Sequence, residues 1–160
     1  MGYQVFLIPS LNKIEQASVW QLQTLAQAYE MTLKTARRTR HSTLSAADKA
    51  VIACSDAVVP IITRWPLSNW AQAELDAAAK ARKPIYSLVE KTHWELFARE
   101  RQDGGIVPFN RDDAIEDVAQ RIHEVVPKEI TSKEASTALG WLLGICAGLF
   151  VLGYLAEPVG

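Results

Sequence analysis

Residues 57–75 of this chain read AVVPIITRWPLSNWAQAEL. The first seven form a short apolar run that is typical of a buried strand, and a Pro-containing connection with Trp65 follows it. Ser68 is a residue type that caps the amino end of a helix, which places Glu74 in the second turn. Ligands of open α/β folds bind beyond the carboxyl ends of the strands. The segment therefore predicts a carboxylate delivered to the edge of a sheet where chemistry can take place.

Strand and helix patterns alternate along the rest of the chain. Apolar runs predict strands over residues 3–8, 31–36, 57–63, 84–89 and 106–109. Helical spacing of apolar residues predicts helices over 14–30, 45–55, 68–82, 93–101 and 112–126. The alternation predicts an α/β fold, a doubly wound parallel sheet of about five strands with helices on both faces.

The composition narrows the classes of partner. A net charge of −1 and a hydrophobic content of 49% are typical of a globular core and argue against nucleic acid as a partner. The two cysteines, Cys54 and Cys146, lie far apart in the chain, and no His/Cys spacing typical of a metal site is present. We therefore expect neither a disulfide framework nor a bound metal, as suits a reducing compartment.

Residues 135–156 contain no charged side chain. As a helix, about 22 residues would extend about 33 Å, which is enough to cross the hydrocarbon core of a bilayer. Lys128 and Lys133 precede this segment and no Lys or Arg follows it, so the positive-inside rule places the N-terminal domain in the cytoplasm. The alternative is a buried helix of a soluble protein, although a domain this small could hardly surround one. The expected organisation is a domain over residues 1–127, a linker over 128–134, a single membrane span over 135–156 and a tail over 157–160.

Gly140, Gly144 and Gly148 repeat every four residues within the expected span. A stripe of small residues at this spacing lets membrane helices pack closely against one another. The stripe therefore predicts self-association, and we expect a homo-oligomer.

Glu74 does not share the polar stripe of its helix. Gln72, Asp76 and Lys80 make up that stripe, and Asp76 and Lys80 are spaced to form an i,i+4 ion pair. Glu74 lies one turn from Trp70, close enough to the amino end of the helix to be partly desolvated yet favoured by the helix dipole. Such a setting is typical of functional carboxylates. The alternative interpretation is an ordinary solvated or capping glutamate.

The order of these features resembles the Toll/interleukin-1 receptor (TIR) domain family over roughly residues 3–126. The residues that carry the resemblance are Ser68, Trp70, Glu74, Leu75 and the Lys-Pro-Ile run at 83–85. The resemblance implies a flavodoxin-like fold and one of two activities. Some members are adaptors that associate with one another. Others, in bacterial and plant immunity, cleave the nicotinamide N-glycosidic bond of NAD with the glutamate that Glu74 matches.

Several residues are candidates for contacts with NAD. They are Ser10, Trp65, Ser68, Trp70, Arg37, Arg38 and Arg40. A tryptophan can stack on a ring of the substrate, although packing in the core is the alternative role for both. The three arginines can hold phosphates by charge-assisted hydrogen bonds. Their alternative roles are a solvated loop or a contact with anionic lipid.

The sequence as a whole predicts a membrane-anchored, TIR-like NAD glycohydrolase that self-assembly activates in a defence or cell-death response. NAD is its substrate, and no cofactor is expected. Two other functions stay open. One is a non-enzymatic adaptor or nucleotide-signal sensor, which the first loop favours because it has no carboxylate before Glu15. The other is a nucleoside 2-deoxyribosyltransferase-like enzyme, which also uses a glutamate on the helix after a central strand.

Overall fold

The computed structural model describes residues 3–9, 31–36, 44–62, 65–101 and 105–110, together with Thr24, Gln27, Asp113, Asp117, Gln120, Arg121 and Glu124. Five strands form one sheet: β1 (Tyr3–Pro9), β2 (Met31–Lys34), β3 (Ala57–Ile62), β4 (Tyr86–Glu90) and β5 (Gly105–Phe109). All neighbouring pairs are parallel, and the strand order is β2-β1-β3-β4-β5. This confirms the α/β fold with a five-stranded parallel sheet, in the order that flavodoxin-like proteins share.

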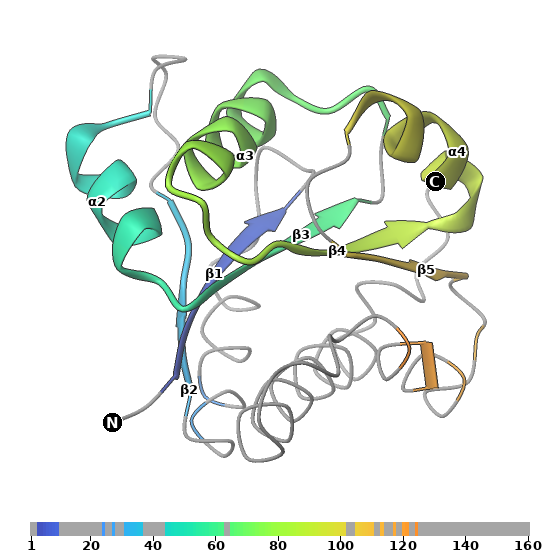
Figure 1. Ribbon diagram of the computed structural model, residues 1–160, viewed down its shortest axis with the longest axis horizontal. Helices are drawn as coiled ribbons and strands as arrows, with labels where there is room; N and C mark the ends of the chain where they lie inside the picture. Colours follow the sequence, from blue (N-terminus) through green and yellow to red (C-terminus); the bar gives the residue numbers. More distant parts are fainter. Residues whose placement is uncertain are drawn as a thin grey trace.

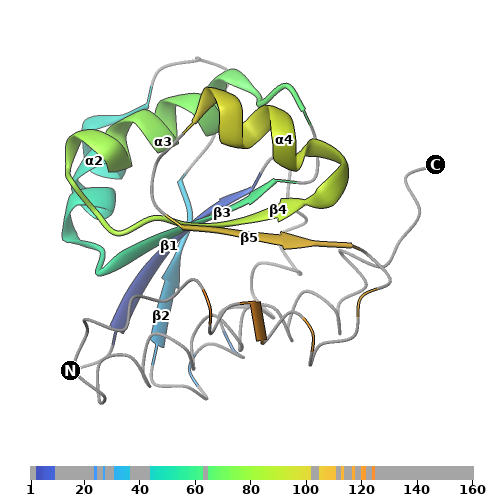
Figure 2. The same ribbon diagram turned by 45° about the vertical axis from the view of Figure 1, so that its right-hand side comes forward.

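Three helices cover one face of this sheet (Figures 1 and 2). They are α2 (Ala46–Cys54), α3 (Asn69–Lys80) and α4 (Lys91–Glu100). The strand residues that point to the opposite face are buried as well; Leu7, Val59 and Leu88 are at most 1% exposed. Both faces of the sheet are thus covered, as parallel sheets require. The helices expected over 14–30 and 112–126 lie outside the described residues, except for single helical positions such as Thr24 and Arg121.

The core between the sheet and these helices follows the alternation of the strands. Phe6 and Ile8 of β1 and Val58 and Ile62 of β3 point to the helices, as successive side chains of a strand alternate between faces. They pack with residues from all three helices, including Phe97 of α4, in one apolar cluster. The apolar runs noted in the sequence are therefore buried on both sides, which explains why they show no polar alternation.

Strand β3 is central although it contains a proline. The N–H of Val58 donates to the carbonyl of Pro84, just before β4, at 2.9 Å. Pro60 lies two residues further along β3 and faces the same neighbouring strand, but proline has no N–H to donate. The regular pairing of β3 with β4 accordingly resumes at Ile61, opposite Leu88. Pairing of β3 with β1 continues through Pro60 without a break. The missing N–H donor at Pro60 is tolerated because pairing with β1 and the buried side chains hold β3 in place.

Polar contacts at the amino edge of the sheet join β1 to the end of α2. The N–H of Gln4 donates to Asp56 Oδ2 at 2.8 Å, and its side-chain amide donates to Ser55 Oγ at 3.2 Å. Ser55 Oγ donates in turn to the carbonyl of Val51 at 2.8 Å. These bonds satisfy the buried Ser55 hydroxyl and lie at the end of the sheet opposite the start of α3.

A second set of polar contacts follows β5. Asp113 Oδ2 accepts from the N–H of Asn110 at 2.8 Å and from Arg121 at 2.5 Å, and the same guanidinium donates to the carbonyl of Pro108 at 3.0 Å. Partial burial by itself raises the pKa of the Asp113 carboxyl, but the hydrogen bonds from Arg121 and Asn110 and the nearby positive charges outweigh it. The net effect lowers this pKa below its usual value.

The expected membrane span over 135–156, its three glycines and the linker over 128–134 lie outside the described residues. Among the helices that are described, none is both long and apolar enough to cross a membrane.

Candidate functional site

Helix α3 begins just beyond the carboxyl end of β3. Ser68 caps it, because its Oγ accepts a hydrogen bond from the N–H of Ala71 at 3.2 Å and its carbonyl accepts one from the N–H of Gln72 at 3.0 Å. The start of the helix expected from the sequence is therefore confirmed. Ser68, a predicted contact for NAD, lies at the carboxyl edge of the sheet with its hydroxyl engaged in this cap.

The other end of α3 is closed by a Schellman motif. The N–H of Lys83 donates to the carbonyl of Ala78 at 3.2 Å, and the N–H of Arg82 donates to the carbonyl of Ala79 at 3.1 Å. Arg82 has a φ of 55°, the left-handed conformation that this position of the motif requires and that glycine adopts most easily. Both ends of the helix that carries Glu74 are thus fixed by hydrogen bonds.

Glu74 is fully buried, with 0% of its surface exposed. It shares the sheet-facing side of α3 with three buried apolar residues, Ala71, Leu75 and Ala78, at the spacing of a single helix face. Asp76, on the polar stripe of the same helix, is exposed. The sequence places Glu74 off the polar stripe and predicts partial desolvation; the structure agrees on the side of the helix and buries the residue completely.

A carboxyl group on this face departs from the pattern of the helix around it. Transfer of a carboxyl group into an apolar layer disfavours its charged form and destabilises the fold by several kcal/mol unless other interactions offset the loss. Packing alone would favour alanine or leucine, as at the neighbouring buried positions of α3. Ionisable groups retained in such surroundings are concentrated at functional sites. Glu74 is therefore the strongest candidate for chemistry in the described part of the chain.

The topology gives this helix a specific place. Strand β1 has β2 on one side and β3 on the other, so the strand order reverses between β1 and β3. Ligands of doubly wound sheets bind at the carboxyl edge of such a switch point. Helix α3 leaves β3 at this edge and packs against β1 (Figure 1). The helix that carries Glu74 thus borders the position where a ligand is expected.

Both candidate tryptophans, Trp65 and Trp70, are partly buried and pack against the apolar cluster. The ring of Trp65 meets the ring of Phe97 edge-on, with centroids 6.0 Å apart and an interplanar angle of 85°. This contact joins the connection before α3 to α4. Each indole therefore takes part in packing, and each keeps some exposed surface near the start of α3.

Four further candidates, Ser10, Arg37, Arg38 and Arg40, lie outside the described residues. Glu74, Ser68, Trp65 and Trp70 therefore lie on α3, at its cap or in the connection before it, and the phosphate-binding role of the three arginines stays a prediction.

Ser87 of β4 was not singled out from the sequence. It alternates with Ile85 and Val89, which both face the helices, so its side chain enters the same layer as α3. Its hydroxyl is buried and makes no hydrogen bond to the part of the chain that the structure describes. The signal that could have found it is a single serine inside the apolar run expected to form a strand over residues 84–89. Ser87 and Glu74 are thus two buried polar side chains between the sheet and its helices.

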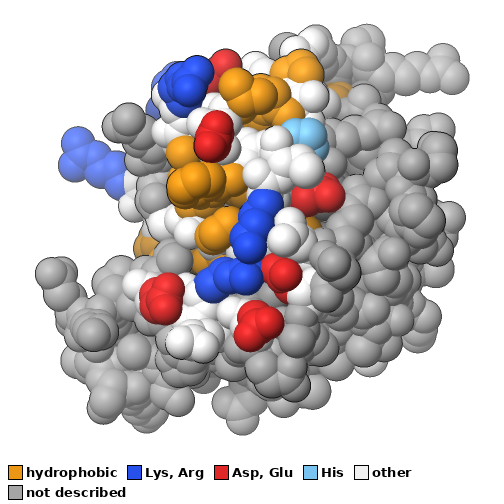
Figure 3. All heavy atoms as spheres, turned by 90° about the vertical axis from the view of Figure 1, so that its right-hand side faces the viewer, with side chains coloured by type: hydrophobic (Ala, Val, Ile, Leu, Met, Phe, Trp, Pro, Cys, Tyr) orange, Lys and Arg blue, Asp and Glu red, His pale blue; other side chains and the backbone are white. Residues whose placement is uncertain are grey.

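The described side chains on the surface beside α4 and β5 carry charges of both signs (Figure 3). Figure 3 shows basic and acidic side chains interspersed with apolar ones on this face. Trp94 and Leu96 of α4 are 43% and 44% exposed. The described residues contain no group of His, Cys, Asp and Glu side chains suited to a metal ion, and Cys54 is an exposed free thiol.

No family model matches this chain, and no curated protein is significantly similar to it in sequence. The assignment of a function therefore depends on the residues and geometry described above.

Proposed function

We propose that this chain is a TIR-like effector that cleaves the nicotinamide N-glycosidic bond of NAD, with Glu74 as the catalytic carboxylate. One observation carries the proposal: Glu74 is buried on the sheet side of α3, in the helix that borders the switch point between β1 and β3. A carboxylate in this position is what the resemblance to TIR enzymes implies for an NAD-cleaving member.

Cleavage of the nicotinamide N-glycosidic bond is promoted by a negative charge close to the ribose. The bond to be broken joins C1 of a ribose to a cationic pyridinium nitrogen, and its electron pair leaves with nicotinamide, which departs as a neutral base. Positive charge then develops on the ribose as an oxocarbenium-like species, and a carboxylate beside it stabilises that charge, as in glycosidases. Water adds to C1 and releases its proton to the solvent, which yields ADP-ribose.

The predicted contacts complete the proposed site. Trp65 or Trp70 stacks on a ring of NAD, while Ser10 and Ser68 bind polar groups near the ribose. The guanidinium groups of Arg37, Arg38 and Arg40 bind the two phosphates. These roles rest on the residue types and on the resemblance to TIR domains.

Self-assembly is the proposed switch. Because Glu74 has no exposed surface, NAD reaches it only after the side chains that cover it move apart. We propose that contacts between copies of the cytoplasmic domain provide this opening. The expected membrane span over 135–156 would concentrate the copies, with Gly140, Gly144 and Gly148 at the contact between spans.

The test uses the full chain reconstituted in liposomes at low and at high protein density, with nicotinamide release measured by chromatography. The rate per molecule is expected to rise with density, and Glu74→Gln should lower it about 100-fold or more. Glu95→Gln makes the same chemical change at an exposed position of α4 and should leave the rate unchanged. Equal rates for wild type and Glu74→Gln at high density would reject the enzyme.

A second candidate is a non-enzymatic adaptor or nucleotide-signal sensor, which the loop after the first strand favours because it has no carboxylate before Glu15. An adaptor should capture its partner from cell extracts whether residue 74 is Glu or Gln. It should lose that partner when Arg37, Arg38 and Arg40 are replaced. Base exchange between deoxynucleosides would instead support the deoxyribosyltransferase-like alternative.

A further inference from the structure

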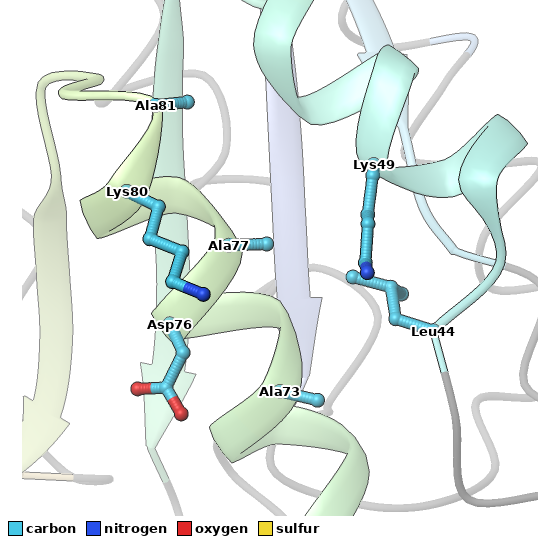
Figure 4. A pocket seen from close by; sticks show the side chains of 7 residues that line it. All are labelled: Leu44, Lys49, Ala73, Asp76, Ala77, Lys80 and Ala81. Carbon is cyan, nitrogen blue, oxygen red and sulfur yellow. The ribbon is translucent and has the colours of Figure 1, made fainter.

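A groove of about 540 Å³ lies between α2 and α3 (Figure 4). Ala73 and Ala77 of α3 and Ala81, the cap residue that follows it, form the floor, and their methyl groups point in a row toward α2. Leu44, just before α2, borders the groove at its other side. The volume falls within the range of sites for small molecules, and the floor is apolar.

Two lysines flank this floor from different helices. Lys49 comes from α2 and Lys80 from α3, and both are exposed. Within the described residues neither forms an ion pair with a carboxylate. Asp76 is the acidic residue at the groove, and its Oδ1 accepts hydrogen bonds from both terminal nitrogens of Arg101, beyond the end of α4. With the charge of Asp76 offset by Arg101, the two lysine charges at the groove have no ion-pair partner among the described residues.

The groove and Glu74 occupy different sides of α3. Glu74 turns to the sheet with Leu75, whereas Ala73 and Ala77 turn toward α2. A ligand in the groove would therefore lie against the helix that carries Glu74 without touching the buried carboxyl.

We infer that this groove binds a small organic anion that has an apolar body. The apolar body packs on Ala73, Ala77 and Leu44, and a phosphate or carboxylate group lies between the ammonium groups of Lys49 and Lys80. An inorganic anion would leave the alanine floor uncovered, and an uncharged ligand would leave the lysines unused. A partner protein would need an interface far larger than this one groove.

The test measures binding of 1-naphthyl phosphate to the full chain by calorimetry. Wild type should bind one molecule per chain, and inorganic phosphate or 1-naphthol alone should bind at least about tenfold more weakly. The pair Lys49→Gln and Lys80→Gln should weaken binding about five- to tenfold, as expected for two exposed charge contacts. The matched pair Lys34→Gln and Lys91→Gln removes the same charge from exposed lysines elsewhere and should change affinity less than about twofold.

A second variant tests the floor. Ala77→Met places a longer side chain in the groove and should weaken binding about tenfold, with thermal unfolding used to verify that the variant is folded. Three results would overturn the inference: no saturable binding to wild type, equal losses for the two lysine pairs, or unchanged affinity in folded Ala77→Met. Lysine-dependent binding of an acidic peptide in place of 1-naphthyl phosphate would overturn it in favour of a protein partner.

Discussion

Trp65 stands edge-on against Phe97, with ring centroids 6.0 Å apart and an interplanar angle of 85°. Trp65 belongs to the connection between β3 and α3, and Phe97 is the buried aromatic residue of α4. The contact therefore joins the connection before α3, the helix that carries Glu74, to α4. Edge-to-face pairs of this kind contribute about 0.5–1.5 kcal/mol beyond the area they bury.

Trp65→Ala should lower the free energy of unfolding by about 2–3 kcal/mol, because a partly buried aromatic side chain and its ring contact are both lost. Trp65→Phe keeps a ring in place and should lose about 1 kcal/mol or less. Urea denaturation of the two variants measures the difference. If Trp65→Ala unfolds like wild type and instead raises the KM for NAD, the indole binds substrate and does not hold the fold.

The fold could be predicted because its signals are local. The apolar run at 57–63 stands out even with Pro60 inside it, and Ser68 marks the start of the next helix. The boundary before α4 could not be found this way. That helix begins at Lys91, directly after β4 and two residues before the expected start, and Glu90 at its cap makes no side-chain capping hydrogen bond. Without a capping residue or a loop, the sequence carries no sign of where the helix begins.

Arg82→Gly should stabilise the protein. Arg82 adopts a φ of 55° at the end of α3, where a side chain with a Cβ is strained by about 1 kcal/mol or more. Glycine removes that strain but makes the unfolded chain more flexible, so the expected net gain is about 0.5 kcal/mol. Thermal and urea unfolding measure the gain. Arg82→Ala retains a Cβ and serves as the control, and an equal gain in both variants would mean that the arginine side chain itself is unfavourable.

Removal of the hydroxyl group should change the free energy of unfolding differently at two buried serines, Ser55 and Ser87. Ser55→Ala breaks hydrogen bonds to Gln4 and Val51 and should destabilise the fold by about 1 kcal/mol or more. Ser87→Ala removes a buried hydroxyl that has no hydrogen bond within the described residues, so it should be neutral or stabilise the fold by up to about 1 kcal/mol. Urea denaturation of both variants gives the comparison. A loss at Ser87 as large as that at Ser55 would show that its hydroxyl is bonded.

The candidate site was only partly predictable. Helical spacing shows that Glu74 leaves the polar stripe, but its complete burial depends on the packing of α3 against the sheet, which includes β1 from the start of the chain. The same limit applies to Asp76, for which spacing suggests an ion pair with Lys80. The structure pairs it with Arg101, which the folding of β4 and α4 brings close. Because Asp76 pairs with Arg101, Lys80 can contact a ligand in the groove between α2 and α3.

The contacts of Asp113 predict one component of the acid sensitivity of the fold. The folded-state pKa of Asp113 lies below its usual value of 3.8, so below that value the unfolded chain binds more protons at this group than the folded chain does. Its contribution to stability is fully present above pH 3.8 and is lost as the pH falls through the lowered pKa. Urea unfolding measured between pH 6 and pH 2 should therefore show a smaller acid-induced loss for Asp113→Asn than for wild type. Asp117→Asn, at an exposed position, is the matched control and should retain the wild-type loss. Identical pH profiles for Asp113→Asn and wild type would mean that the bonds from Arg121 and Asn110 do not distinguish the folded from the unfolded state.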